Sequence, residues 1–230
     1  FFVNPTQDSI FSIRTTNLGN SWSQQSLIYK FESYQNAIVL RLAAIKTNTN
    51  RLILSFAYST ITTINDSITV LKSDDLGHSW DTPIKIKGGT LTSNLSNRIG
   101  ELVLTKSASN TLYLSFNNRS KLFLWFKKSS DNGETWTDTA KIIYNSSTLV
   151  SDLSIVTNDD QNLKAFFFDE YLNKIFKMSS SDSGETWSNP ATVIEDSLQI
   201  KYPRAILTSD NKLWLVYQKE FYYNFPYPMP

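Results

Sequence analysis

Cysteine is absent from the 230 residues, and histidine occurs only once, as His78. A chain without cysteine forms no disulfide, holds no metal through thiolates and carries no cysteine nucleophile. A single histidine also excludes a metal site built from several imidazoles. The sequence therefore predicts neither a cofactor nor a metal site, and we expect His78 to be a solvated loop residue.

An excess of charge of one sign is also lacking, because 22 Lys and Arg stand against 21 Asp and Glu. Phosphate binding needs concentrated cations, so nucleic acid is not an expected partner. The apolar runs, such as Leu52–Ala57, are far shorter than the ~20 residues that a bilayer requires. We therefore expect no membrane span.

What the sequence does have is an octet that recurs four times, at residues 15–22, 73–80, 129–136 and 180–187. The two later copies read S-S-D-N-G-E-T-W and S-S-D-S-G-E-T-W, and the two earlier copies are looser. The tryptophans that end the octets lie 58, 56 and 51 positions apart. A fixed period near this length predicts a solenoid, a propeller or an array.

The order of residues within the octet predicts a tight turn. Glycine supplies the positive φ that a hairpin corner needs, and Asp or Asn two places earlier can accept backbone N–H groups across the turn. The tryptophan gives a flat apolar body that packs beneath the hairpin. We therefore assign a structural role to Asn17, Gly19, Trp22, Asp75, Gly77, Trp80, Asp131, Gly133, Trp136, Asp182, Gly184 and Trp187.

Strand-like segments flank each octet, such as 67–71 before the second copy and 84–86 after it. A second hairpin recurs between the copies, for example 42–45 followed by a polar turn and 52–56. Two hairpins in each period give four antiparallel strands, which is one blade of a β-propeller. No segment shows convincing helical periodicity. The predicted fold class is therefore all-β, with four blades' worth of strands.

The octets resemble the Asp-box, or bacterial-neuraminidase-repeat, superfamily, whose signature reads S-x-D-x-G-x-T-W. Copies 129–136 and 180–187 match every fixed place, 73–80 has Ser79 for threonine, and 15–22 keeps only Gly19 and Trp22. The resemblance covers essentially residues 1–230, which we expect to form a single propeller domain or propeller segment. It implies a sialidase-like propeller whose boxes lie away from the substrate face.

Two arrangements of the blades fit the sequence. In a closed four-bladed ring, the hairpin near residues 204–217 would complete the blade that begins at the N-terminus. In a segment of a larger ring, which we favour, Phe1-Phe2 is the end of an inner strand that precedes the first outer strand. A segment exposes blade faces, so self-association through them is an expected form of partnership.

The resemblance implies a site of three arginines, a tyrosine nucleophile supported by glutamate, and an aspartate acid/base. The candidates for catalytic residues are Arg41, Arg98, Arg204, Tyr202 and Glu101, which lie at or near the starts of inner strands. These residues also fit a second interpretation as solvated strand ends. A glucanase-like pair of aspartates would come from Asp66, Asp81, Asp152, Asp159, Asp160 and Asp169, none with a distinguishing context. Whether the chain is an enzyme therefore stays open; if it is, the resemblance implies a glycoside hydrolase of sialidase type.

Four Asn-x-Ser/Thr sequons occur in predicted loops, at Asn65, Asn94, Asn118 and Asn145. Such sequons are acceptors for N-linked glycans, which need an accessible surface. Together with the resemblance, they favour an extracellular or cell-surface location. Our first hypothesis is a secreted propeller that recognises glycans, with hydrolysis open. The alternative is a non-catalytic cell-surface or assembly module.

Overall fold

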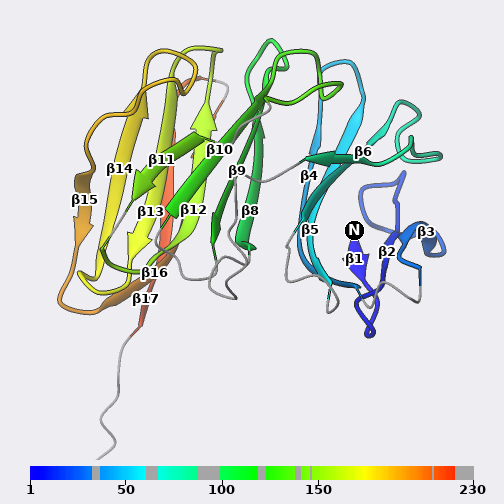
Figure 1. Cartoon of the computed structure of the whole chain (residues 1–230), viewed down its shortest axis with the longest axis horizontal. Coiled ribbons are helices and arrows are strands. Elements are labelled where there is room, and N and C mark those ends of the chain that lie inside the picture. The colour runs from blue at the N-terminus through cyan, green and yellow to red at the C-terminus, as the bar shows by residue number, and fades with distance from the viewer. Residues whose placement is uncertain are drawn as a thin grey trace, which may run out of the picture.

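The computed structural model describes residues 1–32, 37–60, 67–86, 99–118, 123–137, 141–145, 147–208 and 210–220. Within these ranges every regular element is a strand (Figure 1). The strands are β1 (Phe2–Val3), β2 (Ser9–Ser12), β3 (Ser26–Lys30), β4 (Ala37–Lys46), β5 (Leu52–Thr60), β6 (Ser67–Ser73), β7 (Ile84–Ile86), β8 (Ile99–Lys106), β9 (Leu112–Asn118), β10 (Phe123–Ser129), β11 (Lys141–Asn145), β12 (Val150–Thr157), β13 (Leu163–Asp169), β14 (Lys174–Ser180), β15 (Ala191–Glu195), β16 (Gln199–Leu207) and β17 (Leu213–Glu220). The all-β prediction is confirmed.

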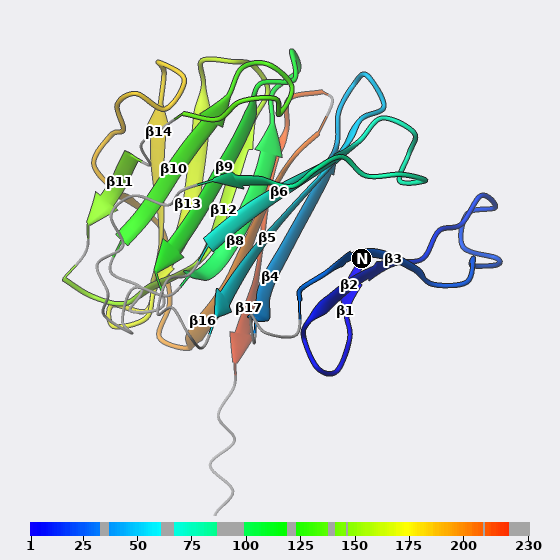
Figure 2. The same cartoon turned by 45° about the vertical axis from the view of Figure 1, so that its right-hand side comes forward.

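The strands form meandering antiparallel sheets, which are the blades. Three blades have four strands each, in the orders β4-β5-β6-β7, β8-β9-β10-β11 and β12-β13-β14-β15. The inner strands contact one another in succession, since β4 lies beside β8, β8 beside β12, and β12 beside β16. Figure 2 shows these sheets fanned side by side. The chain is thus a β-propeller, as the repeat predicted.

Each octet is the corner of an outer hairpin, as the spacing predicted. Gly184 has a φ of +85°, and its N–H donates to Ser180 Oγ at 2.9 Å. Asp182 accepts the N–H of Thr186 at 2.8 Å. The same glycine conformation recurs in the other copies, at Gly19, Gly77 and Gly133. The first copy substitutes Asn17 for aspartate and still accepts a backbone N–H, from Ser21, at 2.9 Å.

The core lies between neighbouring blades, and the box residues help to build it. Trp187 meets Phe126 of the preceding blade edge-on, with ring centroids 5.9 Å apart. Trp136 packs against the apolar cluster that contains Ile53 of the blade before it. Trp80 contacts Phe1 in the same way, at 5.8 Å. Each of these tryptophans therefore joins its own hairpin to the previous blade.

Charged contacts between blades also lie at the box end of the strands. Arg51 contacts Asp74 of its own blade and Glu134 of the next at 2.5 Å each. Lys72 is a second partner of Glu134. These pairs hold the pKa of Glu134 below its usual value, through hydrogen bonds first from Lys72 and then from Arg51. The sixth place of the box thus links one blade to the next.

The two ends of the chain form separate sheets. At the N-terminus β1, β2 and β3 make a three-stranded sheet, in which Phe2 is paired with Phe11. At the other end β16 and β17 form a two-stranded sheet. Because β1 occupies the inner side of β2, β17 does not complete the first blade. The closed four-bladed arrangement, in which 204–217 would do so, is therefore wrong for this structure.

Two of the predicted sequons lie in strands rather than in loops. Asn118 is the last residue of β9 and pairs with Ile99, and Asn145 is the last residue of β11. The ladders extend this far because backbone pairing continues past the apolar positions that marked the strands in the sequence. Asn65, Asn94 and Arg98 lie outside the described residues.

Candidate functional site

The four inner strands share an irregularity near one end. The register shifts between Val39 and Arg41 in β4, between Ile99 and Glu101 in β8, between Ser151 and Ser154 in β12, and between Lys201 and Arg204 in β16. Such bulges bend a strand and redirect its side chains. In β12 and β16 the bulges include a non-glycine residue with positive φ, Asp152 at 57° and Tyr202 at 56°. Positive φ is uncommon for such residues, and here it falls in strands rather than in hairpin turns.

The bulges lie at the end of the blades opposite the Asp boxes. In the second blade, Ser73 of the box pairs with Leu52, and Leu52 pairs with Lys46, the last residue of β4. Arg41 lies on the far side of that pairing, toward the start of β4. The bulge and the Asp box therefore lie at opposite ends of this blade.

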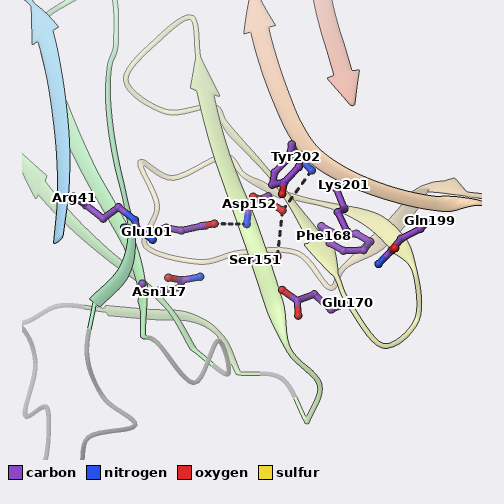
Figure 3. A pocket seen from close by; sticks show the side chains of 11 residues that line it. Arg41, Glu101, Asn117, Ser151, Asp152, Phe168, Glu170, Gln199, Lys201 and Tyr202 are labelled. Carbon is purple, nitrogen blue, oxygen red and sulfur yellow. Dashed lines mark hydrogen bonds between the residues drawn. The ribbon is translucent and has the colours of Figure 1, made fainter. Parts of the chain in front are cut away.

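A cavity of about 730 Å³ opens among the bulges, and we call it the bulge-end cavity (Figure 3). Its lining residues come from four blades and combine charged, amide and aromatic side chains: Arg41, Gly100, Glu101, Asn117, Ser151, Asp152, Phe168, Glu170, Gln199, Lys201 and Tyr202. A second cavity, of about 390 Å³, shares Arg41 and Glu101 and adds Arg204. The sequence candidates Arg41, Glu101, Tyr202 and Arg204 are thus brought together around these two spaces.

A relay of hydrogen bonds crosses the blades at this point. Glu101 Oε1 and Oε2 accept the backbone N–H groups of Asp152 and Leu153, at 2.7 and 2.9 Å. Asp152 Oδ2 in turn accepts the backbone N–H of Tyr202 at 3.4 Å. Each carboxylate therefore holds the bulge of the following blade, as Figure 3 shows for the labelled residues.

Burial raises the pKa of the Glu101 carboxyl above its usual value. The hydrogen bonds from Leu153 and Asp152 oppose that rise in pKa, the negative charge of Asp152 adds to it, and Arg204 counteracts it. An acid with a raised pKa beside a second carboxylate is a pattern seen at catalytic sites. Here, however, both oxygens of Glu101 already accept backbone N–H groups. The geometry gives Glu101 a positioning role.

The arginines and Tyr202 lie at the surface of the site. Arg41 and Arg204 are exposed, and each donates to a neighbouring carbonyl in its own strand, Leu40 at 2.7 Å and Pro203 at 2.9 Å. Tyr202 is 51% exposed. Arg41 lies on β4 and Arg204 lies on β16, and these two strands are not neighbours in the succession of inner strands. The structure therefore brings two arginines of the predicted set to the cavities.

Sequence reasoning missed several lining residues. Asp152 was one of six aspartates without a distinguishing context, yet it occupies the β12 bulge, close to the level of Glu101 in β8. Superposing the repeats would have found it. Phe168, Glu170 and Lys201 carry no comparable signal, because their approach depends on how the blades are placed. Asp160 lies elsewhere and accepts hydrogen bonds from Ser107 and Ser109 of the preceding blade. Asp66 lies outside the described residues.

Groups of three or more residues suited to holding a metal ion are lacking in the described part of the chain. Nor does any helix among those same residues have the length and apolar character to cross a membrane. The cavities themselves hold oxygen and nitrogen groups with two aromatic rings. Such a lining suits a polar organic ligand.

A comparison with known protein families shows which family the chain belongs to. The BNR repeat-like domain matches residues 8–221. The chain belongs to the BNR repeat-like family. No curated protein matches this BNR-repeat chain in sequence.

Solved structures share the fold of the BNR-repeat chain. A protein of unknown function from Dyadobacter fermentans has a TM-score of 0.66 at 15% identity, over 91% of this chain and 59% of its own. The NanB sialidase from Streptococcus pneumoniae has a TM-score of 0.61 at 13% identity, over 91% and 51%. The GH93 α-L-arabinofuranosidase of Fusarium graminearum has a TM-score of 0.62 at 17% identity, over 82% and 58%. The chain thus spans between half and three fifths of these proteins, and at such identities the likeness concerns the fold.

Proposed function

We propose that this BNR-repeat propeller binds a glycan in the bulge-end cavity. The observation that carries the proposal is the convergence of the four inner-strand bulges on one polar cavity. Carboxylate and amide oxygens accept bonds from sugar hydroxyls, and aromatic rings contact the apolar faces of sugars. Asp152, Asn117 and Tyr202 supply one group of each kind, and the Tyr202 ring is 51% exposed.

Asn117 gives this proposal a specific anchor. The residue is completely buried, its Nδ2 donates to the carbonyl of Val150 at 3.3 Å, and its Oδ1 accepts no hydrogen bond from the described residues. A buried acceptor without a partner costs free energy, on the order of 1–3 kcal/mol. A ligand hydroxyl in the cavity that Asn117 lines would satisfy it.

The relatives narrow the sugars worth testing. One similar fold belongs to a sialidase and another to an α-L-arabinofuranosidase. Both names indicate that glycosides are substrates of those proteins. Arg41 is an exposed cation on the cavity wall, and its guanidinium favours a carboxylated sugar such as a sialoside.

Binding is proposed ahead of hydrolysis because Glu101 and Asp152 both accept backbone N–H groups. Glycoside hydrolysis uses one carboxyl group as an acid and a second as a base or nucleophile. Glu101 and Asp152 are the two closest in role, but each accepts backbone N–H groups of the next blade. These two carboxylates therefore act by holding the bulges that shape the cavity.

The test is a glycan array followed by calorimetry and a fluorogenic assay with sialosides and α-L-arabinofuranosides. We expect binding of at least one of these classes, and a loss of about tenfold or more in affinity for Asp152→Asn, equivalent to ~1.4 kcal/mol. Lys212→Ala is the control, because Lys212 is exposed in the β16–β17 hairpin at the opposite end. Silence of the wild type in all three assays would refute the proposal.

A second candidate function, an assembly module without catalysis, is supported by exposed apolar side chains on the terminal sheets. Trp22, in the loop between β2 and β3, is 58% exposed, and Trp214 of β17 is 60% exposed. The other box tryptophans cover a preceding blade, so Trp22 has the chemistry of an unused interface. Sedimentation of the protein over a wide concentration range tests this function, and a strict monomer contradicts it.

An extracellular or cell-surface setting is part of the proposal. Asn145 supports it, because this sequon residue is exposed at the end of β11. Expression in secretory eukaryotic cells followed by peptide mapping tests whether Asn145 accepts a glycan. An unmodified Asn145 in secreted protein would remove this support.

A further inference from the structure

A third cavity adjoins the bulge-end cavity, and we call it the rim cavity. It measures about 580 Å³ and is lined by Ser147, Thr148, Leu149, Glu170 and Tyr171. Two of these side chains expose apolar surface, Tyr171 by 81% and Leu149 by 45%. Leu172, next in the same turn, is 46% exposed. Clustered exposed apolar groups beside a polar cavity indicate a contact surface.

The turn that carries Tyr171 is firmly built although its ring is free. Asp169 is only 1% exposed and accepts the N–H groups of Tyr171 at 3.0 Å and of Leu172 at 2.8 Å. The hydroxyl of Thr148 donates to the other oxygen of Asp169. The N–H of Glu170 donates to the carbonyl of Leu149 at 2.9 Å. The backbone therefore fixes the base of the Tyr171 side chain while packing leaves the ring open to solvent.

Glu170 joins the two spaces, because it lines both the bulge-end cavity and the rim cavity. Figure 3 shows its side chain at the edge of the bulge-end cavity, apart from the Glu101–Asp152 relay. A ligand group that leaves the first cavity past Glu170 therefore arrives at Tyr171 and Leu149.

We propose that Tyr171 is the platform of a second sugar subsite, which receives the ring next to the one held in the bulge-end cavity. This inference rests on the proposed glycan binding and names the ligand class as a disaccharide or longer. A sugar ring has an apolar C–H face and a polar rim. The C–H face stacks on the phenol ring, as apolar groups do on aromatic side chains, and Glu170 accepts a hydroxyl from the polar rim.

The two subsites divide the work by chemistry. The bulge-end cavity presents charged and amide groups, which fix the orientation of the first ring. The rim cavity presents an aromatic ring and a leucine with one carboxylate, which adds contact area with less orientational demand. Removing the Tyr171 platform should therefore weaken the binding of long ligands and leave the binding of single sugars unaffected.

Calorimetry with matched pairs of ligands tests the platform. The pairs are the methyl glycoside of sialic acid against sialyllactose, and methyl α-L-arabinofuranoside against arabinobiose. For the pair that the wild type binds, we expect Tyr171→Ala to lower affinity for the longer ligand about tenfold and for the methyl glycoside less than about twofold. Tyr171→Phe should keep the affinity for the longer ligand within about twofold of the wild type, because this variant retains the aromatic ring that stacks on the sugar.

Trp22→Ala is the matched control, since Trp22 is also an exposed aromatic residue but lies at the box end of another blade. It should leave both ligands unaffected, and thermal unfolding of each variant confirms that it folds. Equal losses for both ligands in Tyr171→Ala, or no loss for either, would overturn the platform while leaving glycan binding in place. If the wild type binds neither member of either pair, the proposed function fails first and the platform falls with it.

Discussion

The carboxylate of Glu101 in one blade and the backbone N–H of Asp152 in the next are joined by a hydrogen bond of 2.7 Å. The second oxygen of Glu101 holds the N–H of Leu153 at 2.9 Å. Both donors are in the β12 bulge, where Asp152 has a φ of 57° and is only 8% exposed. The strained backbone that presents Asp152 to the cavity is thus supported by a side chain from the neighbouring blade.

Removing that support should destabilise the protein and distort the cavity together. Glu101→Ala leaves two buried N–H groups without an acceptor, and we expect the free energy of unfolding to fall by about 2–4 kcal/mol. Urea unfolding measures the change. Glu195→Ala is the control, because Glu195 is 65% exposed and pairs with Lys174 at 3.1 Å on the surface, where a pair contributes about 0–1 kcal/mol. Equal losses in the two variants would contradict the role assigned to Glu101.

The box tryptophans should differ in energetic weight although they share one motif. Trp187 is half-buried, packs on Phe126 and donates from Nε1 to the carbonyl of Gly184 at 3.2 Å. We expect Trp187→Ala to cost about 3 kcal/mol, near the lower end for buried aromatic residues. Trp22 is 58% exposed, so Trp22→Ala should lower the free energy of unfolding by less than about 1 kcal/mol. Chemical denaturation of both variants decides, and a Trp22 loss as large as that of Trp187 would show that Trp22 is covered.

The box glycines give a second matched pair. A Cβ at Gly184 would lie 2.6 Å from Phe126 Cζ, at a φ of +85°. A Cβ at Gly19 would meet nothing nearer than Trp22 Cζ2 at 4.0 Å, at a φ of +91°. Both alanine variants pay the left-handed strain of about 1–2 kcal/mol, and overpacking adds about 1–3 kcal/mol at Gly184 alone. The melting temperature of Gly184→Ala should therefore lie well below that of Gly19→Ala. The reverse order would show that the box at Gly184 does not pack against the preceding blade.

Acid should unfold the protein partly through the box aspartates. Hydrogen bonds from the Thr186 hydroxyl and N–H, and then from Ser180, lower the pKa of Asp182 to about 2. An unfolded aspartate titrates near ~3.9, so the stabilisation is complete above about pH 4 and disappears as the pH falls through about 2. Asp182→Asn should flatten the dependence of stability on pH in that window. Parallel pH profiles for the variant and the wild type would rule out this contribution.

The first box shows why that substitution should keep the fold. Asn17 stands where the other copies have aspartate, accepts the N–H of Ser21 at 2.9 Å and donates to its hydroxyl at 2.8 Å. An amide therefore completes the same turn without a titrating group. Circular dichroism at neutral pH checks that Asp182→Asn is folded before the pH series is interpreted.

The sequence by itself determined the blade. Gly133 and Asp131 fix a hairpin corner through bonds within four residues, and the flanking alternation fixes two strands, so both are readable locally. The same holds for the four-stranded meander, because each strand pairs with its neighbour in the chain. These features depend on short-range geometry, and the four copies of the octet carry the same local pattern.

Only the tertiary structure decided the site. Arg41, Glu101 and Tyr202 were named from their places at the starts of inner strands, but nothing in the sequence showed that they share a cavity. Asp152 gained its context from a bulge held by a residue 51 positions away, and Phe168 and Glu170 reach the cavity from another strand end. Contacts between blades depend on how whole sheets pack around an axis, and that packing sums many weak long-range terms which no local pattern records.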